Sequence, residues 1–169
     1  MSHLQPEFVP YLISWNLTRR CNLRCRHCYI DASTAGPNEL STEEALRVLQ
    51  QIAEVNREIM LILSGGEPLF RSDLDALVSR AAALGMMPVL GTNGTLLTPH
   101  RARRLAQEGL TGVGISLDSI VPERHDDFRR LEGAWHGAVR GAEAARSAGL
   151  DVQIQMTLTP TNLAELPQV

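Results

Sequence analysis

The sequence predicts an α/β domain built on a parallel sheet, and three observations support this prediction. Short apolar runs typical of strands alternate with amphipathic helical patterns along the chain. Glycines follow three of the expected helices, at Gly85, Gly109 and Gly149, where the chain turns toward the next strand. Polar motifs follow four of the expected strands. Because the carboxyl ends of parallel strands meet at one edge of a sheet, we expect these motifs to lie together there.

The first expected element is a strand at residues 12–17, where apolar residues alternate with polar or mixed ones. Residues 1–11 show no period and are expected to form an arm. Residues 29–39 contain a Gly-Pro pair and are expected to form a loop. Residues 12–169 are expected to form one domain, because a chain of 169 residues has the length of a single domain.

Three strand-and-helix units follow. Ser41 and Glu44 form a capping box at the start of the first helix. The continuous apolar run at residues 59–63 predicts a strand covered on both faces, and Ser72 is the expected N-cap of the helix after it. Thr98, followed by a proline, starts another helix. The other expected elements are strands at residues 88–92, 113–117 and 152–158, a helix at residues 134–148, and a further helix beginning near residue 161.

All three cysteines lie within eight residues, with the spacing C-x3-C-x2-C at Cys21, Cys25 and Cys28. Thiolates select iron–sulfur clusters, zinc or Cu(I). Three thiolates on one short loop can converge on one inorganic centre. Iron–sulfur cubes normally take four cysteines, so three ligands would leave one iron open to a group that is not protein.

Three other interpretations of the cysteines compete with the cluster. A zinc site would add a histidine, but His27 adjoins Cys28 and zinc modules usually bring a second ligand pair from a distance. A disulfide with one spare thiol disagrees with the odd cysteine count and the absence of a secretory signal pattern. The spacing also suits a helix with three buried cysteines, but the segment is rich in arginine and asparagine.

The cysteine motif resembles that of the radical S-adenosylmethionine (radical SAM) superfamily. The resemblance runs from Trp15 to about Leu158 and includes Gly-Gly-Glu-Pro at residues 65–68, Thr-Asn-Gly at 92–94 and Ser-Leu-Asp at 116–118. It implies a [4Fe–4S] cluster whose open iron is chelated by S-adenosylmethionine. It also implies a partial TIM barrel of six (β/α) units. Because five strands are expected here, we expect a core truncated after about five strands, with an exposed sheet edge and marginal stability.

The resemblance also implies which residues bind the cofactor. The expected cofactor-binding residues are Gly65, Gly66, Glu67, Pro68, Thr92, Asn93, Ser116, Asp118, Arg129 and Tyr29. Glu67 and its neighbours would meet the ammonium group of the methionine moiety, and Ser116 and Asp118 would meet the ribose. Arg129, with Arg130 as the alternative, would meet the carboxylate. Each motif also has a plain structural interpretation, such as a turn, a helix cap or a solvated helix face.

Aromatic and basic residues surround the thiolates. The resemblance implies that His27 and Tyr29 shield the cluster and meet the adenine. Four arginines flank the cysteines: Arg19, Arg20, Arg24 and Arg26. They would offset the negative charge of the cluster, mark a docking face for an electron donor, or simply be solvated.

The implied function is that of an iron–sulfur enzyme of the oxidoreductase or maturase type. One electron from a flavodoxin- or ferredoxin-like donor would cleave S-adenosylmethionine to a 5′-deoxyadenosyl radical, which abstracts hydrogen from a substrate. The segment at residues 14–29 resembles enzymes of haem d1 and alternative haem biosynthesis and peptide maturases, so a tetrapyrrole, a peptide or a cofactor precursor is the expected substrate. The alternative is a non-catalytic zinc or cluster module, or an inactive fragment.

Composition excludes several partners and places. The formal net charge of −3 gives no reason to expect nucleic acid or an anionic membrane. No apolar run reaches the ~18 residues of a membrane span. Residues 1–10 lack the basic and apolar regions of a signal peptide, so we expect a cytoplasmic protein.

Overall fold

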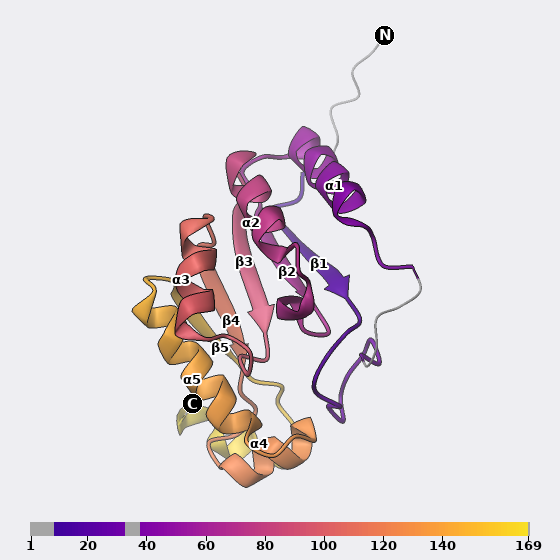
Figure 1. Cartoon of the computed structure of the whole chain (residues 1–169). Coiled ribbons are helices and arrows are strands. Elements are labelled where there is room, and N and C mark those ends of the chain that lie inside the picture. Colours follow the sequence, from indigo (N-terminus) through magenta and orange to yellow (C-terminus); the bar gives the residue numbers. More distant parts are fainter. Residues whose placement is uncertain (1–8, 33–37, 169) are drawn as a thin grey trace.

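The computed structural model describes residues 9–32 and 38–168, which form a parallel sheet with helices (Figure 1). Its strands pair in the order β1-β2-β3-β4-β5, all parallel. The strands are β1 (Leu12–Thr18), β2 (Met60–Gly65), β3 (Met87–Thr92), β4 (Gly112–Ser116) and β5 (Asp151–Gln155). The helices are α1 (Thr42–Val55), α2 (Leu74–Ala83), α3 (Pro99–Gln107), α4 (Pro122–Arg129) and α5 (Ala134–Ser147), with 3₁₀ turns η1 (Pro68–Phe70) and η2 (Leu163–Gln168). The α/β prediction is confirmed.

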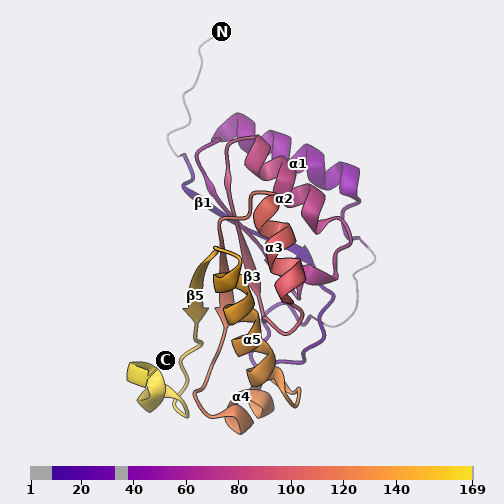
Figure 2. The ribbon, with the colours of Figure 1, turned by 60° about the vertical axis from the view of Figure 1, so that its left-hand side comes forward.

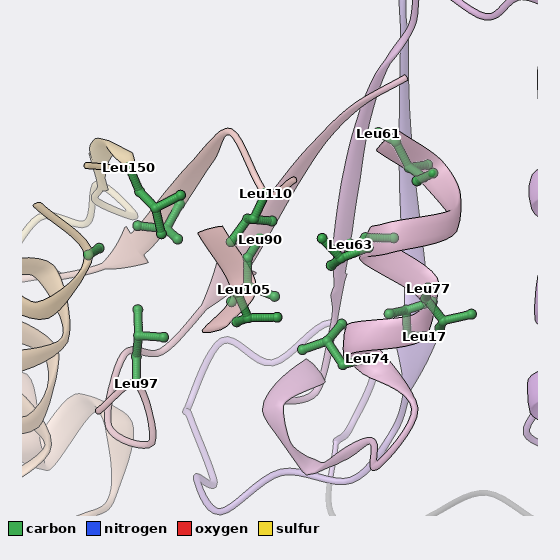
Figure 3. Packing of buried hydrophobic residues seen from close by; sticks show 14 of the residues in the cluster. Leu17, Leu61, Leu63, Leu74, Leu77, Leu90, Leu97, Leu105, Leu110 and Leu150 are labelled. Carbon is green, nitrogen blue, oxygen red and sulfur yellow. The ribbon is translucent and has the colours of Figure 1, made fainter. Parts of the chain in front are cut away.

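Helices α1, α2, α3 and α5 cover one face of the sheet (Figures 1 and 2). Alternate strand residues point into the layer between sheet and helices, and Leu61, Leu63 and Leu90 are fully buried there. Leu77 of α2 and Leu105 of α3 meet them from the helical side (Figure 3). Burial of leucines such as these contributes roughly 2 kcal/mol each, so this layer is what holds the sheet in place.

The opposite face of the sheet is open in the described part of the chain. Leu12, Met60 and Met87 lie near the amino ends of their strands and are 50%, 36% and 48% exposed. Toward the carboxyl ends the residues become small, with Ser64 and Gly91 partly exposed. The small residues leave room for a cavity at this end of the sheet.

Two of the three expected helix caps are present. The Ser41 hydroxyl accepts from the Glu44 N–H at 3.2 Å, and the Glu44 carboxylate accepts from the Ser41 N–H at 2.8 Å. Thr98 caps α3 by accepting from the Arg101 N–H at 3.2 Å. The cap assigned to Ser72 is wrong, because α2 begins at Leu74 with Asp73 in the cap position. The Asp73 carboxylate is held by arginine and threonine side chains and makes no cap bond.

Helix α4 was not expected, and β5 differs from its prediction. In α4, the buried residues are His125 and Arg129, so it lacks an apolar face. Strand β5 ends at Gln155, three residues earlier than expected. Val152 and Ile154 are 36% and 39% exposed, since β5 is the last strand of the described sheet. The helix expected near residue 161 is the 3₁₀ turn η2.

Two predicted segments lie outside the described residues: most of the arm at residues 1–11, and the Gly-Pro pair in the loop before α1. Within the described residues, no helix combines the length and the hydrophobicity that crossing a membrane would require.

Candidate metal centre and cofactor cavity

The cysteine loop and the carboxyl ends of the strands enclose one cavity of about 240 Å³. The expected site residues that line it are Cys21, Cys25, Cys28, Tyr29, Gly65, Gly66, Thr92, Asn93, Ser116 and Arg129. These residues come from the loop after β1, from the ends of β2, β3 and β4, and from the end of α4. Because the carboxyl ends of parallel strands meet at one edge of the sheet, motifs that are far apart in sequence lie together in this cavity.

Each cysteine sulfur accepts a hydrogen bond from a different part of the fold. The donors are the Leu23 N–H and Asn93 Nδ2 for Cys21 (3.4 and 3.9 Å), Arg129 Nη1 for Cys25 (3.8 Å) and the Ala32 N–H for Cys28 (3.2 Å). All three cysteines are free and partly buried. Donors to sulfur stabilise a thiolate and tune the potential of a metal group bound to it.

Burial raises the pKa of the Cys21 thiol and that of the Cys25 thiol. At Cys25 the Arg129 guanidinium acts in the opposite direction, through its charge and its hydrogen bond. A thiol must lose its proton to bind a metal. The arginine therefore favours the metal-binding form of Cys25.

The geometry of the donors indicates what kind of centre fits. Among the residues that the structure describes, no three His, Cys, Asp or Glu side chains are placed to hold a single metal ion. A structural zinc site would need its ligands at ~2.0–2.3 Å around one ion. The three cysteines line one cavity, and thiolates are ligands that select iron–sulfur clusters. The residues present therefore fit an iron–sulfur cluster.

The Gly65-Gly66 turn lies directly against the start of the cysteine loop. The Gly66 N–H donates to Thr18 O at 2.8 Å, and the Glu67 N–H donates to Arg20 O at 2.7 Å. A Cβ at Gly66 would lie 2.3 Å from that Arg20 oxygen, and Gly65 has φ +129°. Glycine is therefore required at both positions, and their backbone forms part of the cavity wall.

Glu67 and Pro68 do not line the cavity. The Glu67 side chain is fully buried and accepts from the Leu69 N–H (3.1 Å), the Asn93 N–H (2.9 Å) and the Thr92 hydroxyl (2.8 Å). Burial raises its pKa to about 7. Both oxygens of this carboxylate join the ends of β2 and β3, and the expected contact with a ligand ammonium stays a prediction.

A network of amides and hydroxyls that the sequence did not suggest supports Cys21. Asn93 Nδ2 donates to Asn22 Oδ1 at 3.0 Å, and Asn22 Nδ2 donates to the Thr95 hydroxyl at 2.9 Å. That hydroxyl donates back to Asn93 Oδ1 at 2.6 Å. The sequence did contain a signal for this network. Asn22 lies inside the cysteine motif, and Asn93 directly follows a strand.

At the end of β4, Ser116 lines the cavity and Asp118 does not. Asp118 is 2% exposed and accepts from Arg129 Nε at 2.6 Å and from the Thr157 N–H at 2.9 Å. Asp118 lies behind the cavity lining, and its expected ribose contact stays a prediction. Arg129 reaches the cavity, while Arg130 is exposed in the left-handed conformation that ends α4.

The end of β5 also contributes to the cavity, which the sequence analysis missed. Gln155, Met156 and Thr157 line it. Gly114 makes room for Gln155, since a Cβ there would lie 2.5 Å from Gln155 Nε2. These residues could have been identified from the sequence. They follow a strand just as the other motifs do, and the carboxyl ends of parallel strands meet at one edge of the sheet.

His27 and Tyr29 lie on the cavity wall with different surroundings. His27 stacks on Phe128 with ring centroids 4.5 Å apart, and burial lowers its pKa. Tyr29 is 83% exposed and donates to Asn16 Oδ1 at 3.2 Å. A residue at the mouth of the cavity could cover a ligand there.

All four flanking arginines make contacts within the fold. Arg19 donates to the Ile30 and Asp31 carbonyls, Arg24 donates to the Ala32 carbonyl, and Arg26 pairs with Asp127. Arg20 lies over the Phe70 ring, 5.5 Å from its centroid. The arginines therefore hold the cysteine loop in addition to surrounding it with positive charge.

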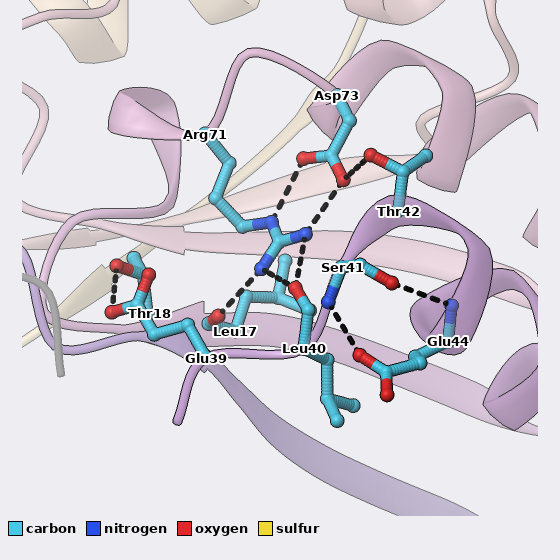
Figure 4. Close-up of polar contacts among 9 residues, drawn as sticks. All are labelled: Leu17, Thr18, Glu39, Leu40, Ser41, Thr42, Glu44, Arg71 and Asp73. Carbon is cyan, nitrogen blue, oxygen red and sulfur yellow. Dashed lines mark hydrogen bonds and ion pairs between the residues drawn. The ribbon is translucent and has the colours of Figure 1, made fainter. Parts of the chain in front are cut away.

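Arg71 anchors the segment through which the loop returns to α1 (Figure 4). Its guanidinium donates to Leu17 O, to Leu40 O and to both oxygens of Asp73. Glu39 accepts from the Thr18 hydroxyl and the Arg19 N–H, each at 2.7 Å. Glu39 and Leu40, just before α1, are thus fixed to the end of β1.

Comparison with known proteins agrees with this site. Residues 15–169 match the Radical SAM superfamily. The chain is 40% identical over 159 residues to an Fe-coproporphyrin III synthase of Methanosarcina barkeri, and 42% identical over 159 residues to a Pre-heme d1 synthase of Dinoroseobacter shibae. Each alignment covers 94% of this chain and 39% of the relative, so the chain spans about two fifths of these relatives.

The solved structure of anSMEcpe with bound AdoMet and Cp18Cys peptide has the same fold. It superposes with a TM-score of 0.75 at 22% identity, covering 94% of this chain and 45% of that one. The fold, the match over residues 15–169 and the cysteine motif agree. The chain belongs to the radical SAM superfamily, whose members use a [4Fe–4S] cluster and S-adenosylmethionine.

Proposed function

We propose that this chain is the core of a radical SAM enzyme that modifies a tetrapyrrole. The observation that carries the proposal is that three cysteines share one cavity with a glycine backbone, a serine and a buried arginine. When bound to this chain, a [4Fe–4S] cluster and S-adenosylmethionine would together supply the one-electron radical chemistry needed to abstract hydrogen from the substrate. The cofactors thus supply the difficult chemistry.

The residues of the chain would hold and orient these groups. Cys21, Cys25 and Cys28 would ligate the cluster, and the Gly65-Gly66 backbone would accept the ammonium group of the methionine moiety. The Arg129 guanidinium would pair with the carboxylate, since planar forks suit carboxylates. The other cavity residues would contact the nucleoside: Ser116, Thr92, Asn93 and Tyr29.

The relatives support a tetrapyrrole as the substrate. Those at 40% and 42% identity are named for coproporphyrin and heme d1 products. The structural neighbour that holds a peptide is only 22% identical. A peptide is therefore the second substrate class. The electron donor would be a small flavodoxin- or ferredoxin-type protein that approaches the exposed arginines of the cysteine loop, and the reaction would take place in the cytoplasm.

Anaerobic reconstitution tests the proposal. We expect about four iron and four sulfide per chain, and formation of 5′-deoxyadenosine when dithionite and S-adenosylmethionine are added. The Cys25→Ala variant is the control and should form none. A fully loaded protein that forms no 5′-deoxyadenosine would contradict the radical reaction, and one tightly bound zinc per chain would indicate a structural site instead. Conversion of coproporphyrin, but not of a peptide, would support the tetrapyrrole assignment.

A further inference from the structure

We propose that Asp118 is a positioning residue that aims the Arg129 guanidinium into the cofactor cavity. This inference rests on the proposed function, and it concerns an ion pair behind the cavity wall. Asp118 Oδ2 accepts from Arg129 Nε at 2.6 Å, and the two side chains are 2% and 9% exposed. Asp118 itself does not reach the cavity.

Arg129 divides its donors between two directions. Its Nε faces Asp118, while Nη1 lies 3.8 Å from Cys25 Sγ and the side chain lines the cavity. The residue is also held through its backbone, because its carbonyl accepts from the Arg24 N–H at 3.3 Å. A long side chain has many rotamers. The pairing at Nε therefore determines where the Nη groups point.

Asp118 can set this direction because three hydrogen bonds hold it, two from the segment after β5 and one to α4. The Thr157 N–H donates to Asp118 Oδ1 at 2.9 Å, and Asn162 Nδ2 donates to its carbonyl at 2.8 Å. The Asp118 N–H donates to His125 Nδ1 at 3.1 Å. The carboxylate is thus fixed relative to β4, to α4 and to the segment after β5, and the guanidinium bound to it is fixed as well.

The ion pair also has an electrostatic consequence. A buried guanidinium without a partner is costly, so Arg129 would otherwise turn toward water or toward the sulfur. With Nε hydrogen-bonded to Asp118, the Nη donors face the cavity, where they can bind an anionic group. We infer that this group is the carboxylate of the amino-acid moiety and that Asp118 contributes to its affinity without contacting it.

The test compares two ligands on the anaerobically reconstituted protein. S-adenosylhomocysteine carries the amino-acid moiety, and 5′-methylthioadenosine lacks it. We expect Asp118→Asn to weaken S-adenosylhomocysteine about tenfold, about 1.4 kcal/mol, and to leave 5′-methylthioadenosine unchanged, as measured by isothermal titration calorimetry. Glu123→Gln is the control for removing a carboxylate, because Glu123 is exposed on α4, the helix that carries Arg129.

A double-mutant cycle keeps the test informative if Asp118→Asn alone folds poorly. Arg129→Met removes the aimed group, and Asp118→Asn combined with Arg129→Met leaves no unpaired buried cation. We expect the double variant to bind S-adenosylhomocysteine no more weakly than Arg129→Met.

Three results would overturn the inference: equal weakening of both ligands, an unchanged affinity in Asp118→Asn, or additive losses in the cycle. Failure of the proposed function would look different, because the wild-type protein would then form no 5′-deoxyadenosine, whatever the variants bind.

Discussion

Glu67 offers the most direct test of the energetics of this site. Its carboxyl group is fully buried between the ends of β2 and β3, and burial raises its pKa from 4.5 to about 7. The folded state therefore holds a proton that the unfolded state releases above pH 4.5. Stability from this group is complete below about pH 4.5 and is lost as the pH rises through about 7.

The size of the effect follows from the shift. A change of about 2.5 pKa units corresponds to roughly 3 kcal/mol. The Glu67→Gln variant does not titrate, so we compare the free energies of unfolding of the metal-free wild type and variant in urea between pH 4.5 and 8. The wild type should lose about 3 kcal/mol relative to the variant across this range.

Exposed Glu58→Gln serves as the control for removing a carboxylate, and its difference from wild type should stay constant with pH. A wild-type advantage over Glu67→Gln that grows as the pH rises would refute the reasoning. It would mean that the two backbone N–H donors from Leu69 and Asn93 outweigh burial and hold the carboxylate ionised.

Three further predictions concern packing and anchoring. Gly66→Ala should reduce iron incorporation several-fold, measured as iron per chain after reconstitution, because its Cβ would lie 2.3 Å from Arg20 O. Leu105→Ala should lower the free energy of unfolding by about 3 kcal/mol in urea, because this side chain is fully buried. Arg71→Ala should cost about 3 kcal/mol in the same assay, since it leaves the mostly buried Asp73 without its partner, and it should speed cleavage after Glu39 by a glutamate-specific protease.

The strands and most helices could be predicted because their signals are local. The apolar run that became β2 and the capping box at Ser41 each depend on a few neighbouring residues. Helix α4 was missed because its residues are polar on most faces, and the buried ones are His125 and Arg129. The Ser72 cap failed because Arg71 binds Asp73 and so fixes the turn one residue later.

The sequence predicted the edge of the sheet at which the site lies, but not the direction in which each side chain points. The cysteines and the glycines could be placed because spacing and the absence of a side chain determine their position. Glu67 and Asp118 are buried. Glu67 binds Asn93 after β3, and Asp118 binds Arg129 on α4. Such partners are far away in sequence, so no local pattern contains them. Asn22 likewise supports Cys21 through Asn93, a residue far away in sequence.

The hydrogen bonds between the glycine turn and the cysteine loop have a consequence for how this protein can vary. Because the Gly66 and Glu67 N–H groups bind main-chain oxygens, the path of the loop at Arg20 does not depend on which side chain that residue carries. The exposed side chain at Arg20 can therefore change from basic to neutral or acidic without rerouting the cysteines. A library randomised at Arg20 would therefore vary the charge beside the cysteines while conserving the path of the loop.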